Sequence, residues 1–245
     1  MKKHIPNFLT SLNVFCGTLS VFFALNGHLK TSAILIFIAA LFDFSDGFAA
    51  RMLKAYSDIG KELDSLADLI SFGMAPAAIL SSIMMGLYGV ASMNEFIELD
   101  TLSKFAILFP FLLVVFAALR LAKFNIDTRQ SENFLGLTTT ATGIFTASFV
   151  FLIAKGLSWT QWLVSPLSLI ILIAIFCGLL VSEIPMFSLK FKNYSFKNNL
   201  NRYILLIAGL ALIVSLGMAG ISILIVLYIV FSLFTSLVCK SNNGK

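Results

Sequence analysis

Charged residues are scarce in this sequence. Only 12% of its 245 residues are Asp, Glu, Lys or Arg, whereas 59% are hydrophobic. Soluble domains carry about twice that share of charge, so the composition excludes an ordinary soluble protein. A helix needs about 20 residues to cross the hydrocarbon of a bilayer, which leaves room for about six to eight spans. We therefore expect an integral membrane protein that forms a single domain over residues 1–245.

Cysteine and histidine are also rare. Cys16, Cys177 and Cys239 are widely separated, and each lies in or beside an apolar segment. An odd, scattered set of cysteines indicates buried free thiols rather than a disulfide framework. His4 and His28 are expected near opposite faces of the membrane, so we expect no metal site built from His or Cys.

Apolar runs separated by polar breaks predict eight membrane spans. The spans are expected over residues 8–25, 31–52, 64–90, 103–124, 138–155, 162–182, 202–218 and 220–238. The division between the last two rests only on the segment from Gly217 to Gly220. The expected fold class is thus an all-α integral membrane protein.

Lysine and arginine are distributed unevenly over this map. With a cytoplasmic N-terminus, fourteen of the 17 basic residues fall on the cytoplasmic side, and Lys30, Lys104 and Lys155 fall on the other. Cytoplasmic loops are enriched in these residues, so we expect both termini in the cytoplasm. The net charge of +5 then attracts anionic lipid headgroups at one face. No basic stripe with interleaved aromatic residues is present, so nucleic acid is not an expected partner.

The most informative stretch runs from Leu41 to Ile70 and holds six of the twelve acidic residues, four of them aspartates on two helix faces. On a first predicted helix, one face carries Asp43, Asp46, Gly47, Ala50 and Arg51. On the next helix, residues four apart stack on one face: Gly60, Asp64 and Asp68. Two helices thus direct two carboxylates each into a shared space, and the small residues leave room for a bulky ligand.

This arrangement of carboxylates predicts a cation site. An Asp at the centre of a bilayer costs about 2.5–3.5 kcal/mol, and four carboxylates repel one another unless they are protonated or bridged by cations. Oxygen ligands without His or Cys favour Mg²⁺ or Mn²⁺, which would attract an anionic ligand such as a pyrophosphate. The alternative to a cation site is that the aspartates lie at solvated helix ends and form ion pairs with Arg51, Lys54 and Lys61. Four carboxylates on two matching faces favour the metal site.

The spacing resembles a known signature. Asp43-x-x-Asp46-Gly47-x-x-Ala50-Arg51, followed after eight residues by Gly60-x-x-x-Asp64-x-x-x-Asp68, matches that of the CDP-alcohol phosphatidyltransferases at every defined position. Other segments resemble the phosphatidylserine synthase branch of that family: Pro6-Asn7-x-x-Thr10-x-x-Asn13 and residues 71–76, 120–125, 134–137 and 184–188. One departure is Thr138, at which the branch is expected to have proline.

The resemblance implies an activity and a set of ligands. The phosphatidyl group of CDP-diacylglycerol would pass to the hydroxyl of L-serine, with release of CMP, at the cytoplasmic side of the cell membrane. Mg²⁺ or Mn²⁺, as two ions, would be held by Asp43, Asp46, Asp64 and Asp68, with Asp68 also the candidate general base. The resemblance further implies a homodimer.

Two groups of residues are expected to bind the substrates. The set for CDP-diacylglycerol is Asn7, Thr10, Asn13, Gly47, Ala50, Arg51 and Gly60. The set for serine is Arg120, Lys123, Asn125 and Ser71, because a cationic cluster suits a carboxylate. For Arg120 and Lys123 the alternative is a positive-inside anchor in which Lys123 reaches the interface. For Asn7, Thr10 and Asn13 of the first helix, the alternative is hydrogen bonding between helices.

Two other functions stay open. The same chemistry could use glycerol 3-phosphate or inositol phosphate, because Arg120 and Lys123 alone do not exclude a phosphorylated acceptor. A divalent-cation transporter would also need aspartates, but such a site is expected near the middle of the membrane. The aspartates of this sequence map to cytoplasmic helix ends.

Overall fold

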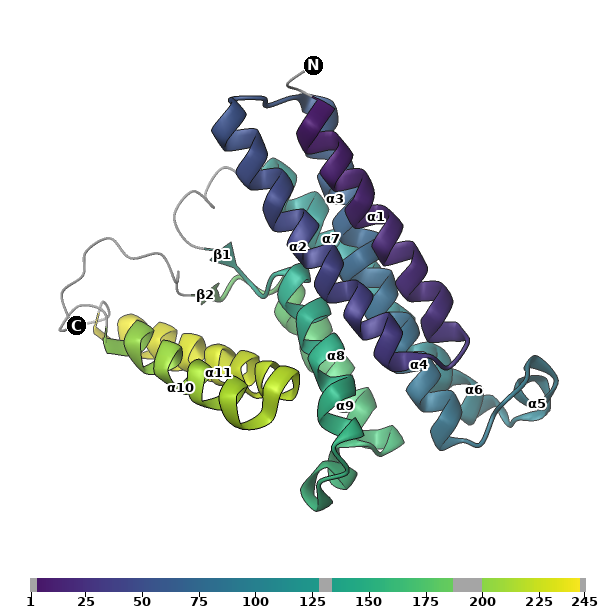
Figure 1. Ribbon diagram of the computed structural model, residues 1–245. Coiled ribbons are helices and arrows are strands. Elements are labelled where there is room, and N and C mark those ends of the chain that lie inside the picture. Colours follow the sequence, from purple (N-terminus) through teal and green to yellow (C-terminus); the bar gives the residue numbers. More distant parts are fainter. Residues whose placement is uncertain (1–3, 128–133, 187–199, 243–245) are drawn as a thin grey trace.

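The structure is a computed structural model that describes residues 4–127, 134–186 and 200–242, and these residues are almost entirely helical (Figure 1). The helices are α1 (His4–Leu25), α2 (Leu29–Leu53), α3 (Asp58–Asp68), α4 (Ala75–Leu87), α5 (Met93–Glu98), α6 (Thr101–Leu108), α7 (Leu112–Ile126), α8 (Thr139–Ala154), α9 (Pro166–Val181), α10 (Leu200–Leu216) and α11 (Gly220–Asn242). Two strands, β1 (Phe134–Leu135) and β2 (Pro185–Met186), pair antiparallel.

The helical segments follow the predicted spans. A π-helical turn at Leu69–Met74 joins α3 and α4 into one continuous helix, and a 3₁₀ turn at Phe109–Phe111 joins α6 to α7. Five helical stretches are long and apolar enough to cross a membrane, and α8 and α9 are shorter apolar helices. The protein is therefore a helical membrane protein. The crossing of the membrane by all eight segments and the cytoplasmic position of the termini stay predictions.

Several details differ from the prediction. The third long helix begins at Asp58 rather than at residue 64, because the side chain of Ser57 accepts a hydrogen bond from the Gly60 amide at 3.1 Å and caps the helix. Helix α9 begins at Pro166 rather than at residue 162, because Ser158–Leu163 forms a 3₁₀ turn. Helix α5 and the strand pair were not expected.

Helix α1 buries small and polar residues and exposes large apolar ones. Phe8, Phe15 and Phe22 are exposed, whereas the opposite face of α1 packs on α2. There the Ser20 hydroxyl donates to the Ser32 carbonyl at 2.9 Å, and the Ser32 hydroxyl donates to the Ser20 carbonyl at 2.8 Å. Small residues let helices approach closely in a membrane, so this face holds the last turns of α1 against the first turns of α2.

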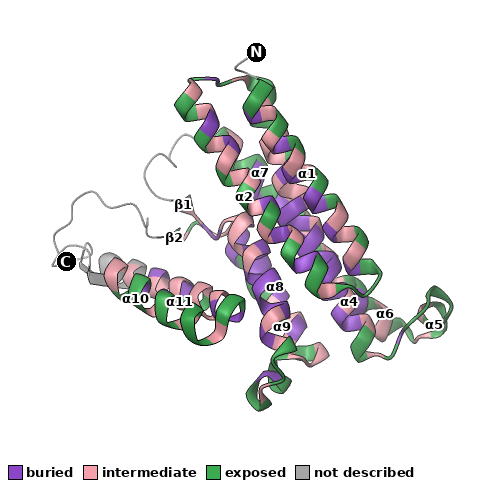
Figure 2. Cartoon of the chain, in the orientation of Figure 1, coloured by how far each residue is buried: buried purple, intermediate pink, exposed green. Residues whose placement is uncertain are grey.

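The π-helical turn and α4 lie at the centre of the bundle, where most residues are buried (Figure 2). Two glycines let neighbouring helices reach this turn. A Cβ at Gly17 of α1 would lie 2.8 Å from the Ser71 Cα, and a Cβ at Gly143 of α8 would lie 2.7 Å from the Phe72 ring. The turn that follows Asp68 is therefore held between α1 and α8.

The last two helices form a hairpin. A 3₁₀ turn at Gly217–Ala219 separates them, at the position where the sequence predicts a break. The hairpin lies beside α8 and at a steep angle to it, away from α1 and α2 (Figure 1). The Ser148 hydroxyl of α8 donates to the Met218 carbonyl and accepts from the Ser222 amide, both at 2.6 Å.

The thiols described by the structure are buried and free. These are Cys16 and Cys177, as the sequence predicts. The side chain of Cys239 lies outside the described residues.

Candidate active site

Three of the predicted aspartates converge from two helices. Asp43 of α2 and Asp64 and Asp68 of α3 each place a carboxylate oxygen within 4.8 Å of the other two. All three side chains are partly buried. The Oδ1 atom of Asp68 is shielded from solvent and has no hydrogen-bond partner among the described residues. A buried acceptor without a partner is destabilising, so this oxygen is suited to a ligand.

Asp46 lies beside this cluster. It is buried, and its Oδ2 accepts a hydrogen bond from the Thr10 hydroxyl of α1 at 2.5 Å. The same hydroxyl lies 3.0 Å from the Pro6 carbonyl. Helix α1 therefore fixes the orientation of Asp46, whose carboxylate is not one of the three that converge.

The cluster fits a divalent cation. Its donors are all carboxylate oxygens, which Mg²⁺ and Mn²⁺ prefer. Three partly buried negative charges within 4.8 Å repel one another unless a cation or protons neutralise them. The unpartnered Asp68 Oδ1 offers lone pairs to such a cation. The choice between Mg²⁺ and Mn²⁺, and the presence of a second ion, stay predictions.

A cleft of about 720 Å³ opens beside Asp46 and Asp64, between the first turns of α1, the end of α2 and the start of α3. It is lined by five of the seven residues expected to bind CDP-diacylglycerol: Asn7, Thr10, Gly47, Ala50 and Gly60. Asn13 and Arg51 do not line it. Asn13 is fully buried in α1, and Arg51 is exposed.

The two glycines of the cleft serve different purposes. A Cβ at Gly47 would have nothing nearer than the Arg51 guanidinium at 4.0 Å, so Gly47 leaves open space. A Cβ at Gly60 would lie 2.9 Å from the Ser57 hydroxyl and 3.0 Å from Asn7 Oδ1. Gly60 therefore allows α1 and the start of α3 to approach each other closely.

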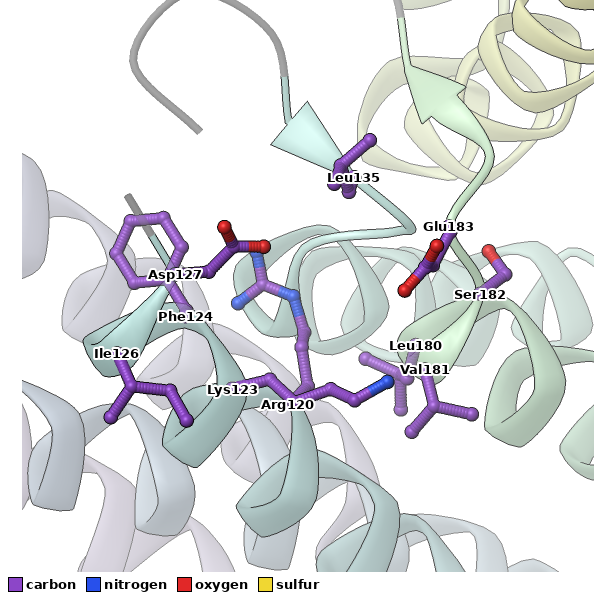
Figure 3. Close-up of a pocket in the computed structure, with 10 residues that line it drawn as sticks. All are labelled: Arg120, Lys123, Phe124, Ile126, Asp127, Leu135, Leu180, Val181, Ser182 and Glu183. Carbon is purple, nitrogen blue, oxygen red and sulfur yellow. The ribbon is translucent and has the colours of Figure 1, made fainter. Parts of the chain in front are cut away.

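A second pocket, of about 300 Å³, lies where α7, β1 and the end of α9 meet (Figure 3). Arg120 is buried at this pocket, and its Nε has no hydrogen-bond partner among the described residues. Its guanidinium carbon lies 5.6 Å from the centre of the Phe124 ring. Arg120 is also near enough to Asp68 for the two opposite charges to attract. It therefore connects this pocket, here called the Arg120 pocket, with the carboxylate cluster.

Lys123 also lines the Arg120 pocket, but Asn125 and Ser71 do not. The Asn125 amide donates to the Ser65 hydroxyl at 2.9 Å, and the Asn125 carbonyl accepts from Lys61 at 3.1 Å. Ser71 is fully buried and donates to a backbone carbonyl of α1 at 3.0 Å. These bonds hold α7 and α1 against the continuous α3–α4 helix.

Sequence analysis did not single out three other polar residues of the Arg120 pocket: Asp127, Ser182 and Glu183. None belongs to a charged motif. The one indication of a role in the sequence is that Glu183 directly precedes the segment 184–188, which resembles the family. Residues 187–188 of that segment lie outside the described residues.

Thr138, where the sequence departs from the branch, caps a helix in the structure. Its side chain accepts a hydrogen bond from the Ala141 amide at 3.2 Å and caps α8. Proline has no side chain that can do this.

Fold and site together define a class of protein. It is a helical membrane protein in which a carboxylate cluster suited to a divalent cation lies between a large cleft and a small pocket lined by charges of both signs. Such an arrangement suits the transfer of a phosphate-linked group between two bound molecules.

Comparison with known proteins gives the family. Residues 3–191 match the family model described as CDP-alcohol phosphatidyltransferase. The chain belongs to the CDP-alcohol phosphatidyltransferase family, as the resemblance predicts, and is a membrane transferase.

Several curated relatives are similar to it in sequence. A CDP-diacylglycerol–serine O-phosphatidyltransferase of Bacillus subtilis is 37% identical over 135 residues, which are 55% of this chain and 68% of the relative. An archaetidylserine synthase of Methanothermobacter thermautotrophicus is 35% identical over 147 residues, 59% of this chain and 57% of the relative. A CDP-diacylglycerol–serine O-phosphatidyltransferase of Helicobacter pylori is 30% identical over 236 residues, 93% of this chain and 89% of the relative.

Proposed function

We propose that the protein transfers the phosphatidyl group of CDP-diacylglycerol to the hydroxyl of L-serine and releases CMP. The observation that carries this proposal is the continuity of the site. The carboxylate cluster borders the cleft through Asp64 and approaches the Arg120 pocket through Asp68. A nucleotide donor and a small acceptor can therefore bind on two sides of the same carboxylates. The names of the relatives support serine as the acceptor.

The cleft is proposed to hold the CDP part of the donor. Asn7 and Thr10 offer polar groups at its wall, and Gly47 and Ala50 leave the α2 backbone open to a flat ligand. Direct contributions from Asn13 and Arg51 stay predictions. The acyl chains would remain among the lipids, which the exposed Phe44 and Phe48 of α2 also contact in this arrangement.

The metal ions are proposed to be held by Asp43, Asp46, Asp64 and Asp68. When bound, they would neutralise the negative charge of the pyrophosphate and of the departing CMP. The chain contributes the orientation of these side chains, and the Thr10 bond to Asp46 is part of it.

Asp68 is proposed as the general base. The Asp68 carboxylate would take the proton of the serine hydroxyl as the hydroxyl oxygen attacks the β-phosphorus. The new oxygen–phosphorus bond forms while the bond from the β-phosphorus to the bridging oxygen breaks, and CMP leaves with that oxygen. The nearby Arg120 keeps a positive charge beside Asp68.

Arg120 and Lys123 are proposed to bind the serine carboxylate. A guanidinium can bind a carboxylate through two parallel hydrogen bonds, and Arg120 Nε has no hydrogen-bond partner among the residues that the structure describes. For Asn125 and Ser71, the observed hydrogen bonds favour an indirect contribution through the positions of α7 and α3.

The proposal is tested by CMP release from purified protein in mixed micelles of CDP-diacylglycerol, with Mg²⁺ or Mn²⁺. Serine, glycerol 3-phosphate and inositol phosphate are supplied in parallel. We expect release with serine alone, and loss of release on chelation of the metal. Release with a phosphorylated acceptor alone would replace serine in the proposal. No release with any acceptor, together with metal flux into proteoliposomes, would favour the transporter.

We further propose that the protein resides in the cell membrane with this site on the cytoplasmic side, and that it forms a homodimer. The uneven distribution of lysine and arginine supports the orientation. The dimer rests on the family resemblance alone, and the mass of the protein–detergent complex by light scattering tests it.

A further inference from the structure

The Arg120 pocket is lined by charges of both signs, with Arg120, Lys123 and Asp127 at the end of α7 and Glu183 on the facing wall. The end of α7 supplies Arg120 and Lys123, and the segment that follows α9 supplies Ser182 and Glu183. In Figure 3 the Glu183 carboxylate and the Lys123 ammonium group point toward the space between these walls. A pocket with charges of both signs suits a ligand that also carries both.

The two charges differ in depth. Arg120 is buried and its Nε has no partner within the described part of the chain, whereas Glu183 is exposed. A small zwitterion would therefore bind with its carboxylate inside and its ammonium group toward the opening. The volume of about 300 Å³ is at the lower end of the range for ligand pockets, which agrees with a molecule of the size of an amino acid.

Backbone contacts fix the wall that bears Glu183. The amide of Gly136 donates to the Ile184 carbonyl, and the amide of Leu137 donates to the Leu179 carbonyl, each at 2.9 Å. Gly136 has a φ of +71°, and a Cβ there would lie 2.7 Å from the Ser182 carbonyl oxygen. Both neighbours of Glu183 are thus held against the chain around Gly136. The segment 134–137, which sequence analysis notes only as a resemblance, therefore positions this wall.

We propose that Glu183 binds the ammonium group of an amino-acid acceptor whose carboxylate is bound by Arg120, and thereby selects an amino acid over an acceptor phosphate. This inference rests on the proposed transfer to serine. A phosphorylated alcohol would place at least one additional negative charge in a pocket that already contains Glu183, and that repulsion disfavours it. Asp127 lies on the same wall as Arg120, so it does not supply the negative charge on the facing wall.

The test compares L-serine with 3-hydroxypropionate, which has the same hydroxyl and carboxylate but lacks the ammonium group. In the Glu183→Gln variant we expect the KM for serine to rise about tenfold or more, because a hydrogen bond to a charged group is lost. The KM values for 3-hydroxypropionate and for CDP-diacylglycerol should stay within about twofold of wild type. An unchanged KM for serine, or equal increases for both acceptors, would overturn the inference.

Two matched variants complete the experiment. Glu98→Gln removes an exposed carboxylate on α5, remote from the pocket, and should leave all three KM values unchanged. Asp127→Asn should not reduce the preference for serine over 3-hydroxypropionate; if it alone does so, Asp127 is the ammonium partner and the inference is wrong. Should Glu183→Gln not fold, Glu183→Asp keeps the charge and must retain that preference, and its loss would also overturn the inference.

The same measurements distinguish this inference from the proposed function. If wild-type protein releases no CMP with serine, the proposed function itself fails. If wild-type protein is active with serine and the Glu183→Gln variant keeps the full preference for serine over 3-hydroxypropionate, only the role of Glu183 fails.

Discussion

Asp68 is the residue at which the parts of the site meet. Its carboxylate belongs to the three-aspartate cluster, its Oδ1 has no hydrogen-bond partner among the described residues, and Arg120 lies near it. An asparagine keeps nearly the same shape but cannot act as a general base. We expect Asp68→Asn to lower CMP release by about 100-fold or more while the protein still folds, because the change removes one of several repelling charges.

The measurement is CMP release together with thermal unfolding in detergent. Glu62→Gln is the matched control, since Glu62 is an exposed carboxylate on the same helix, outside the cleft. Turnover like that of wild type in Asp68→Asn would remove Asp68 as the base.

Gly47 tests whether the cleft holds the nucleotide. A Cβ there meets nothing nearer than 4.0 Å, so Gly47→Ala should fit and stabilise the helix by about 0.5–1 kcal/mol. Gly47→Leu should also fold, but its larger side chain would fill the space beside Asp46. We expect Gly47→Leu to raise the KM for CDP-diacylglycerol at least about tenfold and to leave the KM for serine unchanged. A normal lipid KM in that variant would place the nucleotide elsewhere.

Sequence patterns locate the residues of the carboxylate cluster but not those of the acceptor pocket. Asp43, Asp64 and Asp68 follow from spacing, since residues four apart share a helix face, and the structure brings them together. Glu183 is a single acid after an apolar helix, and no local pattern separates it from an ordinary surface residue. Its place opposite Arg120 depends on contacts with the distant segment around Gly136.

At the scale of the elements, the π-helical turn after Asp68 is the feature that sequence periodicity does not show. A π-helical turn contains an additional residue, so the side chains beyond it change direction, and such turns are often found at functional sites. Ser71 lies in this turn and contacts α1. In a regular helix of 3.6 residues per turn, Ser71 would point in nearly the same direction as Asp68. The sequence therefore predicts Ser71 at the serine site.

Close packing around the turn should be essential to the site. A Cβ at Gly143 would lie 2.7 Å from the Phe72 ring and 3.1 Å from the Phe72 Cα, which is backbone and cannot simply rotate away. We expect Gly143→Ala to destabilise the protein by about 1–3 kcal/mol and to reduce CMP release, because displacement of the turn also moves Asp68. Thermal unfolding and CMP release measure the two effects.

Gly86→Ala is the control for that substitution. Gly86 lies in α4, in the same continuous helix as Phe72, and a Cβ there would have no neighbour within 4 Å. Its unfolding temperature should be equal to or higher than that of wild type. If Gly143→Ala unfolds at the same temperature as Gly86→Ala, the contact of α8 with the turn is not tightly packed.

At the scale of the whole molecule, apolar runs predict most of the helices but not how they are assembled. The eight predicted spans correspond to eight helical segments, with ends that differ where local capping decides them, as at Ser57. The steep angle of the α10–α11 hairpin against α8 depends on contacts such as those of Ser148 with Met218 and Ser222. These residues are 70 and 74 positions apart, and no local pattern relates them.

The orientation in the membrane decides from which side serine can reach the Arg120 pocket. Fourteen of the 17 lysines and arginines fall on one side of the predicted map, so we expect the turn between α2 and α3 to face the cytoplasm and α5 to face outward. In a protein with Cys16, Cys177 and Cys239 replaced by alanine, Asn94→Cys should react with an impermeant maleimide on intact cells. Lys54→Cys should react only after the membrane is permeabilised. CMP release shows whether each variant is folded.

A reporter that fluoresces only in the cytoplasm, fused after Lys245, tests whether the number of membrane crossings is even. With eight spans and a cytoplasmic N-terminus the reporter should fluoresce, whereas an odd number of spans would place it outside. The reverse labelling of Asn94→Cys and Lys54→Cys would place the carboxylate cluster on the external face. Serine and the metal would then have to be supplied from outside the cell, and the proposed orientation would be wrong even if the chemistry were right.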